Sequence, residues 1–169
     1  MSSLVYFIHT AILMIIQLLL LDNIQISSYV YLNIYILALL LAPDEYSDTF
    51  VLLMAFILGA IVDFANNTMG IHTAAATLMA YFRPTILGAV SVRQNSPIKT
   101  ALRSNNTSWL AKYIALTSVI YFVSFIMLEA FSFRAFHITL LRVVFSTVAS
   151  FVIMILYYFT AIRTSSRHE

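Results

Sequence analysis

The sequence predicts an all-α integral membrane protein, a single domain over residues 1–169 that crosses the bilayer about six times. The first observation is composition: 62% of the residues are hydrophobic and only 9% are charged, whereas a soluble domain carries roughly 25% charged residues. The second is the grouping of the apolar residues into six segments. The longest polar loop between them covers residues 93–108, so no separate soluble domain is expected.

The first two apolar segments are long enough to cross a membrane as helices. A bilayer core of about 30 Å takes about 20 helical residues at about 1.5 Å per residue. Residues 4–21 carry His9 and Gln17 in an otherwise largely apolar run. Residues 26–42 end before Pro43, which lacks the N–H that would continue a helix. We expect one span from each segment.

The third and fourth segments are less regular. Residues 50–62 precede Asp63, and a helix of that length reaches only about 20 Å. Residues 70–92 are interrupted by Arg83 and Pro84. We therefore expect these two helices to be short or broken. They either cross separately or form a re-entrant hairpin, and both arrangements return the chain to the same side.

The last two segments, residues 113–133 and 135–162, are long enough to cross with tilt. All nine Lys and Arg residues follow residue 82, and the loop 93–108 contains three of them without a nearby acid. The positive-inside rule places this basic loop in the cytoplasm. Counting the spans outward from it predicts that both chain termini are cytoplasmic.

Ionisable groups at membrane depth cost about 2.5 to 3.5 kcal/mol on insertion scales and so indicate functional positions. Asp63 ends the third segment, nine residues before His72. Asp63 either forms a ligand, proton or partner site or caps the following turn through backbone contacts. His72 alone is more typical of a hydrogen-bonded packing residue. The amides of Gln17 and Asn33 are expected to bridge helices.

Glu129 and Arg142 lie on either side of the short turn between the fifth and sixth segments. Antiparallel packing of these two segments brings the carboxylate within reach of the guanidinium. We expect an intramembrane ion pair with a structural role, for which Arg134 is a competing partner.

Small residues recur at four-residue spacing in the third and fourth segments. Ala55 precedes Gly59 by four residues, and Ala76 precedes Ala80 by four. This spacing lets helix backbones approach closely. We expect the two segments to pack tightly against each other or against a partner.

Nothing in the sequence indicates catalysis or a cofactor. The chain has no cysteine, which excludes thiolate metal sites and cysteine nucleophiles. It also lacks a zinc-protease motif, a Gly-rich phosphate loop and a serine elbow. No basic patch interleaved with aromatic residues suggests nucleic acid. We expect a protein that is not an enzyme and holds neither metal nor cofactor.

The central part of the chain resembles the rod shape-determining protein MreD family. The resemblance is carried by residues 58–63 (LGAIVD), residues 69–74 (MGIHTA) and Tyr81. Gln17 and Asp22 also resemble the end of the first span in that family. Only the block from Gly59 to Tyr81 is specific, because many small membrane proteins share the remaining pattern.

The resemblance implies a bacterial inner-membrane scaffold without chemistry of its own. Its partners would be MreC, by direct contact, and MreB, RodA and a class B penicillin-binding protein in the same complex. The chain itself would also contact membrane lipids. Gly59, Asp63, Gly70 and His72 would shape a packed helix pair or a partner surface. The segment from Asp63 to His72 would be extracytoplasmic and organise the contact with MreC.

A second family gives an alternative function. MreD-like proteins are similar in fold to the substrate-binding membrane subunits of energy-coupling importers, so a small-molecule binder is the alternative reading. Those subunits carry an Ala-x-x-x-Ala coupling surface on the first span, whereas residues 4–21 contain only Ala11. This departure favours the scaffold. A proton-coupled transporter using Asp63 and Glu129 would lack the inverted repeats usual for such folds.

Overall fold

The structure is a computed structural model that describes residues 3–22, 30–43, 45–91, 107–130 and 136–162. In these residues all regular structure is helical, as expected for an all-α protein. The elements are α1 (Ser3–Ile16) with the π-helix η1 (Gln17–Leu21), α2 (Ile36–Leu40), α3 (Asp48–Asn66), α4 (Ile71–Ser91), α6 (Thr107–Ala130), and α7 (Phe136–Tyr157) with the π-helix η2 (Tyr158–Ile162).

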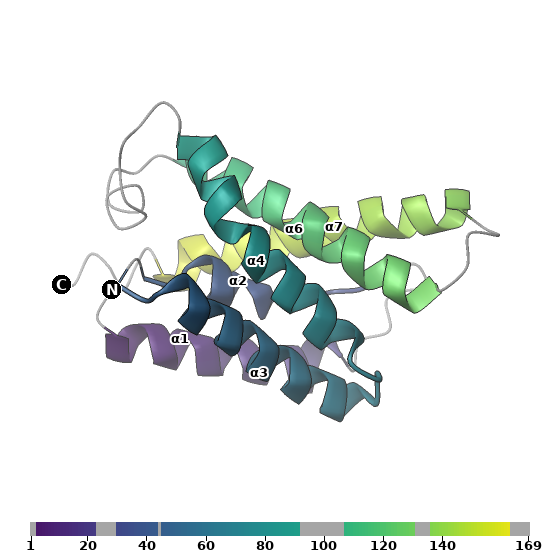
Figure 1. The fold of residues 1–169 in the computed structure, drawn as a ribbon, viewed down its shortest axis with the longest axis horizontal. Helices are drawn as coiled ribbons and strands as arrows, with labels where there is room; N and C mark the ends of the chain where they lie inside the picture. The colour runs from purple at the N-terminus through teal and green to yellow at the C-terminus, as the bar shows by residue number, and fades with distance from the viewer. Residues whose placement is uncertain (1–2, 23–29, 44, 92–106, 131–135, 163–169) are drawn as a thin grey trace.

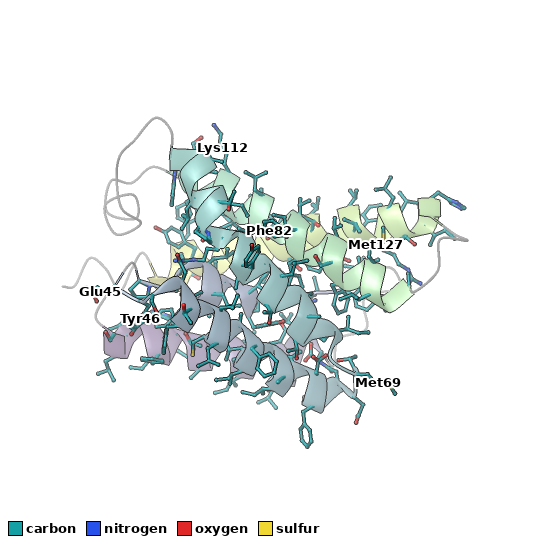
Figure 2. The ribbon with its side chains drawn as sticks, in the orientation of Figure 1. Glu45, Tyr46, Met69, Phe82, Lys112 and Met127 are labelled. Carbon is teal, nitrogen blue, oxygen red and sulfur yellow. The ribbon has the colours of Figure 1, made fainter. Side chains whose placement is uncertain are left out.

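The five long helices of the described residues surround the short helix α2: α1, α3 and α6 run in one direction along the bundle, and α4 and α7 run in the opposite direction (Figure 1). We call one end of the bundle the turn end, because it holds the α3–α4 turn, residues 67–70. We call the opposite end, where α3 begins and α4 finishes, the Arg83 end. Figure 2 shows Met69 at the turn end, and Glu45 and Lys112 at the Arg83 end.

Within the described residues, four helices are long and apolar enough to cross a membrane. They are Ser3–Leu21, Asp48–Asn66, Ser108–Ala130 and His137–Thr160. Large apolar side chains are exposed along all four, including Leu19, Phe64 and Phe145. A water-facing surface would not carry so many. The chain is built as an all-α membrane protein, with four such helices where the sequence predicted six spans.

The expectation of a short third helix is wrong. α3 has 19 residues, or about 28 Å at 1.5 Å per residue, because its polar ends are helical as well. Ser47 caps the start, where its hydroxyl accepts a hydrogen bond from Phe50 N at 3.2 Å. Asn67 ends the helix in the left-handed conformation, with φ of 55°.

The expectation of a broken fourth helix is also wrong, because α4 continues through Pro84 for 21 residues. Proline removes one helical N–H, but the helix is held at this point by its neighbours. The buried Arg83 donates from Nη2 to the carbonyl of Ala42 at 2.8 Å. Its Nη1 lies 3.9 Å from Asp48 Oδ1 at the start of α3.

The largest correction concerns the second segment, residues 26–42. Of its described part, only Ile36–Leu40 is α-helical, and residues 30–35 are irregular. The chain nevertheless runs the length of the bundle, since Asp22 contacts Asn66 at the turn end and Ala42 contacts Arg83. We call residues 30–42 the central segment. Residues 32–42 are all buried.

Side chains of surrounding helices satisfy the carbonyl groups around the end of α2. Tyr6 donates its hydroxyl to the carbonyl of Ala38 at 3.1 Å, and Tyr113 donates to that of Leu40 at 3.2 Å. Irregular backbone at membrane depth is tolerated only where protein or a water-filled cavity satisfies its polar groups. The central segment meets this requirement by lying inside the bundle.

Candidate functional site

Gln17 is the residue that anchors the irregular part of the central segment. Its side chain is fully buried where α1 becomes η1. Oε1 accepts from Ile34 N at 2.8 Å, and Nε2 donates to Leu32 O at 2.9 Å. Nε2 also lies 2.5 Å from Asp22 Oδ1. Gln17 therefore gives the backbone of residues 32–34 the kind of hydrogen-bond partners that a neighbouring β-strand would give.

Two serines of α7 bind the same stretch of backbone from the other side. Ser146 Oγ accepts from Tyr31 N at 3.0 Å, and Ser150 Oγ accepts from Asn33 N at 3.1 Å. Both serines are fully buried. Sequence reasoning missed them, although their four-residue spacing places both on one face of a helix and could have indicated a polar contact.

Asp63 joins the end of α3 to the start of α4. Its Oδ1 accepts from Thr68 Oγ1 at 2.6 Å and from His72 N at 2.9 Å. Its Oδ2 accepts from Thr73 N at 2.8 Å and from Thr73 Oγ1 at 2.5 Å. A carboxylate has about four acceptor positions, so this one is saturated. These contacts are the ones expected if Asp63 caps the following turn, which is one of the two roles that the sequence allowed.

Gly59 allows the close approach of α3 and α4 that Asp63 requires. A Cβ at this position would lie 2.6 Å from Thr73 Cα and 2.9 Å from Thr73 N. Gly70 has a different function, because its φ of 87° closes the turn in a conformation that other residues rarely adopt. The small-residue spacing of the two segments corresponds to this contact.

His72 begins a buried polar chain between α4, α6 and the central segment. Its Nδ1 lies 2.9 Å from the hydroxyl of Tyr121, which lies 3.1 Å from the hydroxyl of Tyr35. The ring of Phe125 packs on His72 with centroids 4.6 Å apart. Neither tyrosine was singled out in the sequence, where a tyrosine in an apolar run is not distinguishable from a lipid-facing one.

Asp22 and Glu129 face the same region from opposite sides of the bundle. Asn66 Nδ2 donates to Asp22 Oδ2 at 2.8 Å. Glu129 accepts a hydrogen bond from the hydroxyl of Tyr31. Arg142 Nη1 lies 3.9 Å from Glu129 Oε2, and the side chains of Arg142 and Glu129 are 28% and 30% exposed. This is the pairing expected from the sequence, whereas the competing Arg134 lies outside the described residues.

These groups surround a cavity of about 480 Å³ at the turn end of the bundle. Five of the residues singled out in the sequence line it directly: Asp22, Asn33, His72, Glu129 and Arg142. Gln17 and Asp63 lie behind its wall, whereas Gly59 belongs to the α3–α4 contact. The full lining is Leu21, Asp22, Val30, Tyr31, Leu32, Asn33, Asn66, Thr68, Ile71, His72, Phe125, Glu129 and Arg142.

The cavity contains groups for binding but no arrangement for holding a metal. Within the described residues, no three His, Asp or Glu side chains come together as metal ligands. Of the basic loop, residues 93–106 lie outside the described part of the chain, and residues 107 and 108 begin α6. The chain matches no protein-family model, no curated protein and no solved structure.

Proposed function

We propose that this chain is a non-catalytic integral membrane scaffold of the bacterial cell-elongation machinery. It would lie in the inner membrane with both termini in the cytoplasm and contact MreC directly, with MreB, RodA and a class B penicillin-binding protein in the same complex. Arg83 and Lys112 favour this orientation, since both belong to the Arg83 end, which would then be cytoplasmic.

The observation that supports the proposal most is the structural role of Asp63 and Gly59. Both belong to the block from Gly59 to Tyr81 that resembles the MreD family. All four acceptor positions of Asp63 are occupied by groups of residues 68–73. Gly59 serves the approach of α3 to α4. A carboxylate in this state has no position left for a substrate, so its contribution is to fix the shape of the turn.

The turn end supplies a surface for a partner. Met69 is fully exposed, and Phe64, two residues before the end of α3, is 89% exposed. Because the turn between them is fixed by Asp63, these side chains have defined positions. We place the membrane-proximal region of MreC against this surface.

Capture of MreC by the tagged protein from membranes tests the proposal. Asp63→Ala and Gly70→Leu should reduce capture by changing the turn. Met69→Ser should reduce capture without changing the fold, and Val148→Ser is its matched control, an exposed apolar residue on α7. Undiminished capture by the Asp63, Gly70 and Met69 variants at normal protein levels would contradict the scaffold function.

The cavity favours one alternative, a substrate-binding membrane subunit of a small-molecule importer. Its volume lies within the range of about 300 to 1,000 Å³ that is typical of small-molecule sites. Co-purification from native membranes distinguishes the two functions. Recovery of MreC and wall-synthesis enzymes supports the scaffold, and recovery of importer ATPases supports the alternative.

A further inference from the structure

Two carboxylates, those of Asp22 and Glu129, line the cavity at the turn end. Unlike Asp63, they have acceptor positions that no hydrogen bond occupies in the described part of the chain. Among the described residues, Asp22 accepts one hydrogen bond at each oxygen, and both donors are neutral amides, from Gln17 and Asn66. The buried Oε2 of Glu129 accepts none in the described part of the chain, because Arg142 stands 3.9 Å away. A buried carboxylate oxygen without a donor is costly, so these positions favour a ligand that brings N–H groups.

The charge of the lining favours the same ligand. Three basic residues occur in the described part of the chain, Arg83, Lys112 and Arg142, and only Arg142 lines the cavity. Asp22 and Glu129 together with Arg142 give the described lining one formal net negative charge. A cation is therefore attracted to the cavity, whereas a second anion is repelled.

Two deeply buried polar side chains in the lining have unused groups. Asn33 is 2% exposed and His72 is 5% exposed. The amide Nδ2 of Asn33 and the ring Nε2 of His72 have no hydrogen-bond partner among the described residues, since the bonds of these side chains run through Asn33 Oδ1 and His72 Nδ1. Both residues line the cavity, so these two nitrogens are available to a polar occupant.

We propose that this cavity binds a small molecule through a primary ammonium group, held between Asp22 and Glu129. Asn33, His72 and Arg142 bind the remainder of the molecule, and the ring of Phe125 closes one side. The inference goes beyond the scaffold function and does not depend on it, since a scaffold and an importer subunit could each hold such a ligand.

The test is calorimetric titration of the full chain in phosphatidylcholine nanodiscs. Three four-carbon probes of similar size are compared: 1,4-diaminobutane, 4-aminobutanoate and succinate. We expect both amines to bind and succinate not to bind. Binding of 4-aminobutanoate alone identifies a zwitterion site that uses Arg142, and binding of the diamine alone identifies a dication site. Nanodiscs with added phosphatidylethanolamine show whether a lipid headgroup supplies the ammonium, because it then competes with the bound amine.

Variants connect binding to the cavity. Asp22→Asn should weaken amine binding about tenfold, the usual effect of losing one charge-assisted contact. Asp48→Asn is the matched control, since its side chain is 70% exposed at the Arg83 end. Ile71→Phe fills the cavity without removing a polar contact, so it should also weaken binding in a protein with an unchanged melting temperature.

Three results would overturn the inference. One is the absence of amine binding tighter than about 1 mM in both nanodisc compositions, with no competition by phosphatidylethanolamine. Another is binding of succinate as tight as that of the amines. The third is equal amine affinity in Asp22→Asn, Ile71→Phe and the unchanged protein. Failure here leaves capture of MreC unaffected, so the two proposals fail separately.

Discussion

Replacing Gly59 by alanine tests the close contact of α3 and α4 most directly. The new Cβ would lie 2.6 Å from Thr73 Cα, and ordinary contact begins at 3.4 Å, so the helices must separate by about 0.8 Å. Thr73 N and Oγ1 bind Asp63 at 2.8 and 2.5 Å, and this shift would stretch both bonds. Overpacking costs about 1 to 3 kcal/mol, and a weakened bond to a charged group costs up to about 1.5 to 3 kcal/mol.

Alanine also gains about 1 kcal/mol in helix propensity over glycine, so we expect a net loss of about 2 to 4 kcal/mol. For a chain of this length that lowers the melting temperature by roughly 5 to 15 °C. Gly88→Ala is the matched control, because it lies in α4 with nothing within 4 Å of the new Cβ. Thermal unfolding in detergent measures both. Equal melting temperatures for the two variants would refute the close contact.

Three further predictions concern the groups around the central segment. Gln17→Leu should prevent stable folding, because it leaves the backbone of Ile34 and Leu32 without partners at membrane depth; recovery of normal monodisperse protein from membranes would contradict this. Ser146→Ala and Ser150→Ala should each cost about 1 to 2 kcal/mol, measured by thermal unfolding, and a double variant no less stable than either single one would show that only one bond matters. Glu129→Gln should cost less than about 1 kcal/mol, since its ion pair with Arg142 is long and about a third exposed, and a drop in melting temperature above about 5 °C would show a stronger pair.

The sequence predicted the long apolar helices but not the path of residues 30–42. Hydropathy measures which side chains avoid water, and it does not distinguish a helix that faces lipid from an irregular segment enclosed by helices. Both need apolar side chains at nearly every position. The information that makes this segment irregular lies elsewhere in the chain, in Gln17, Ser146 and Ser150, which supply its hydrogen bonds.

The errors in the third and fourth segments have a related cause. Counting apolar residues ended the third helix at Asp63, although a polar residue can remain helical where another element satisfies it. Asp63 is helical because residues 68–73 bind its carboxylate. α4 passes Pro84 while Arg83 is held by Ala42 and Asp48. In each case the polar side chain is satisfied by a partner outside its own helical turn: residues of the following turn for Asp63, and residues 35 to 41 positions away for Arg83. Counting apolar residues along one segment does not take these partners into account.

The sequence indicated individual residues of the candidate site, but it did not indicate that they lie together in the folded protein. His72, Glu129 and Arg142 were selected because polar groups are costly at membrane depth, and Asp22 through the resemblance at the end of the first segment. The four residues lie in or next to four different helical elements and meet only in the folded bundle. Thr68 connects this cavity to the α3–α4 turn, since it lines the cavity and also donates to Asp63. His72 does the same through its backbone N–H and its ring. The wall of the cavity and the shape of the exposed turn therefore depend on the same two residues, so a ligand that moves either one must also move the surface around Met69.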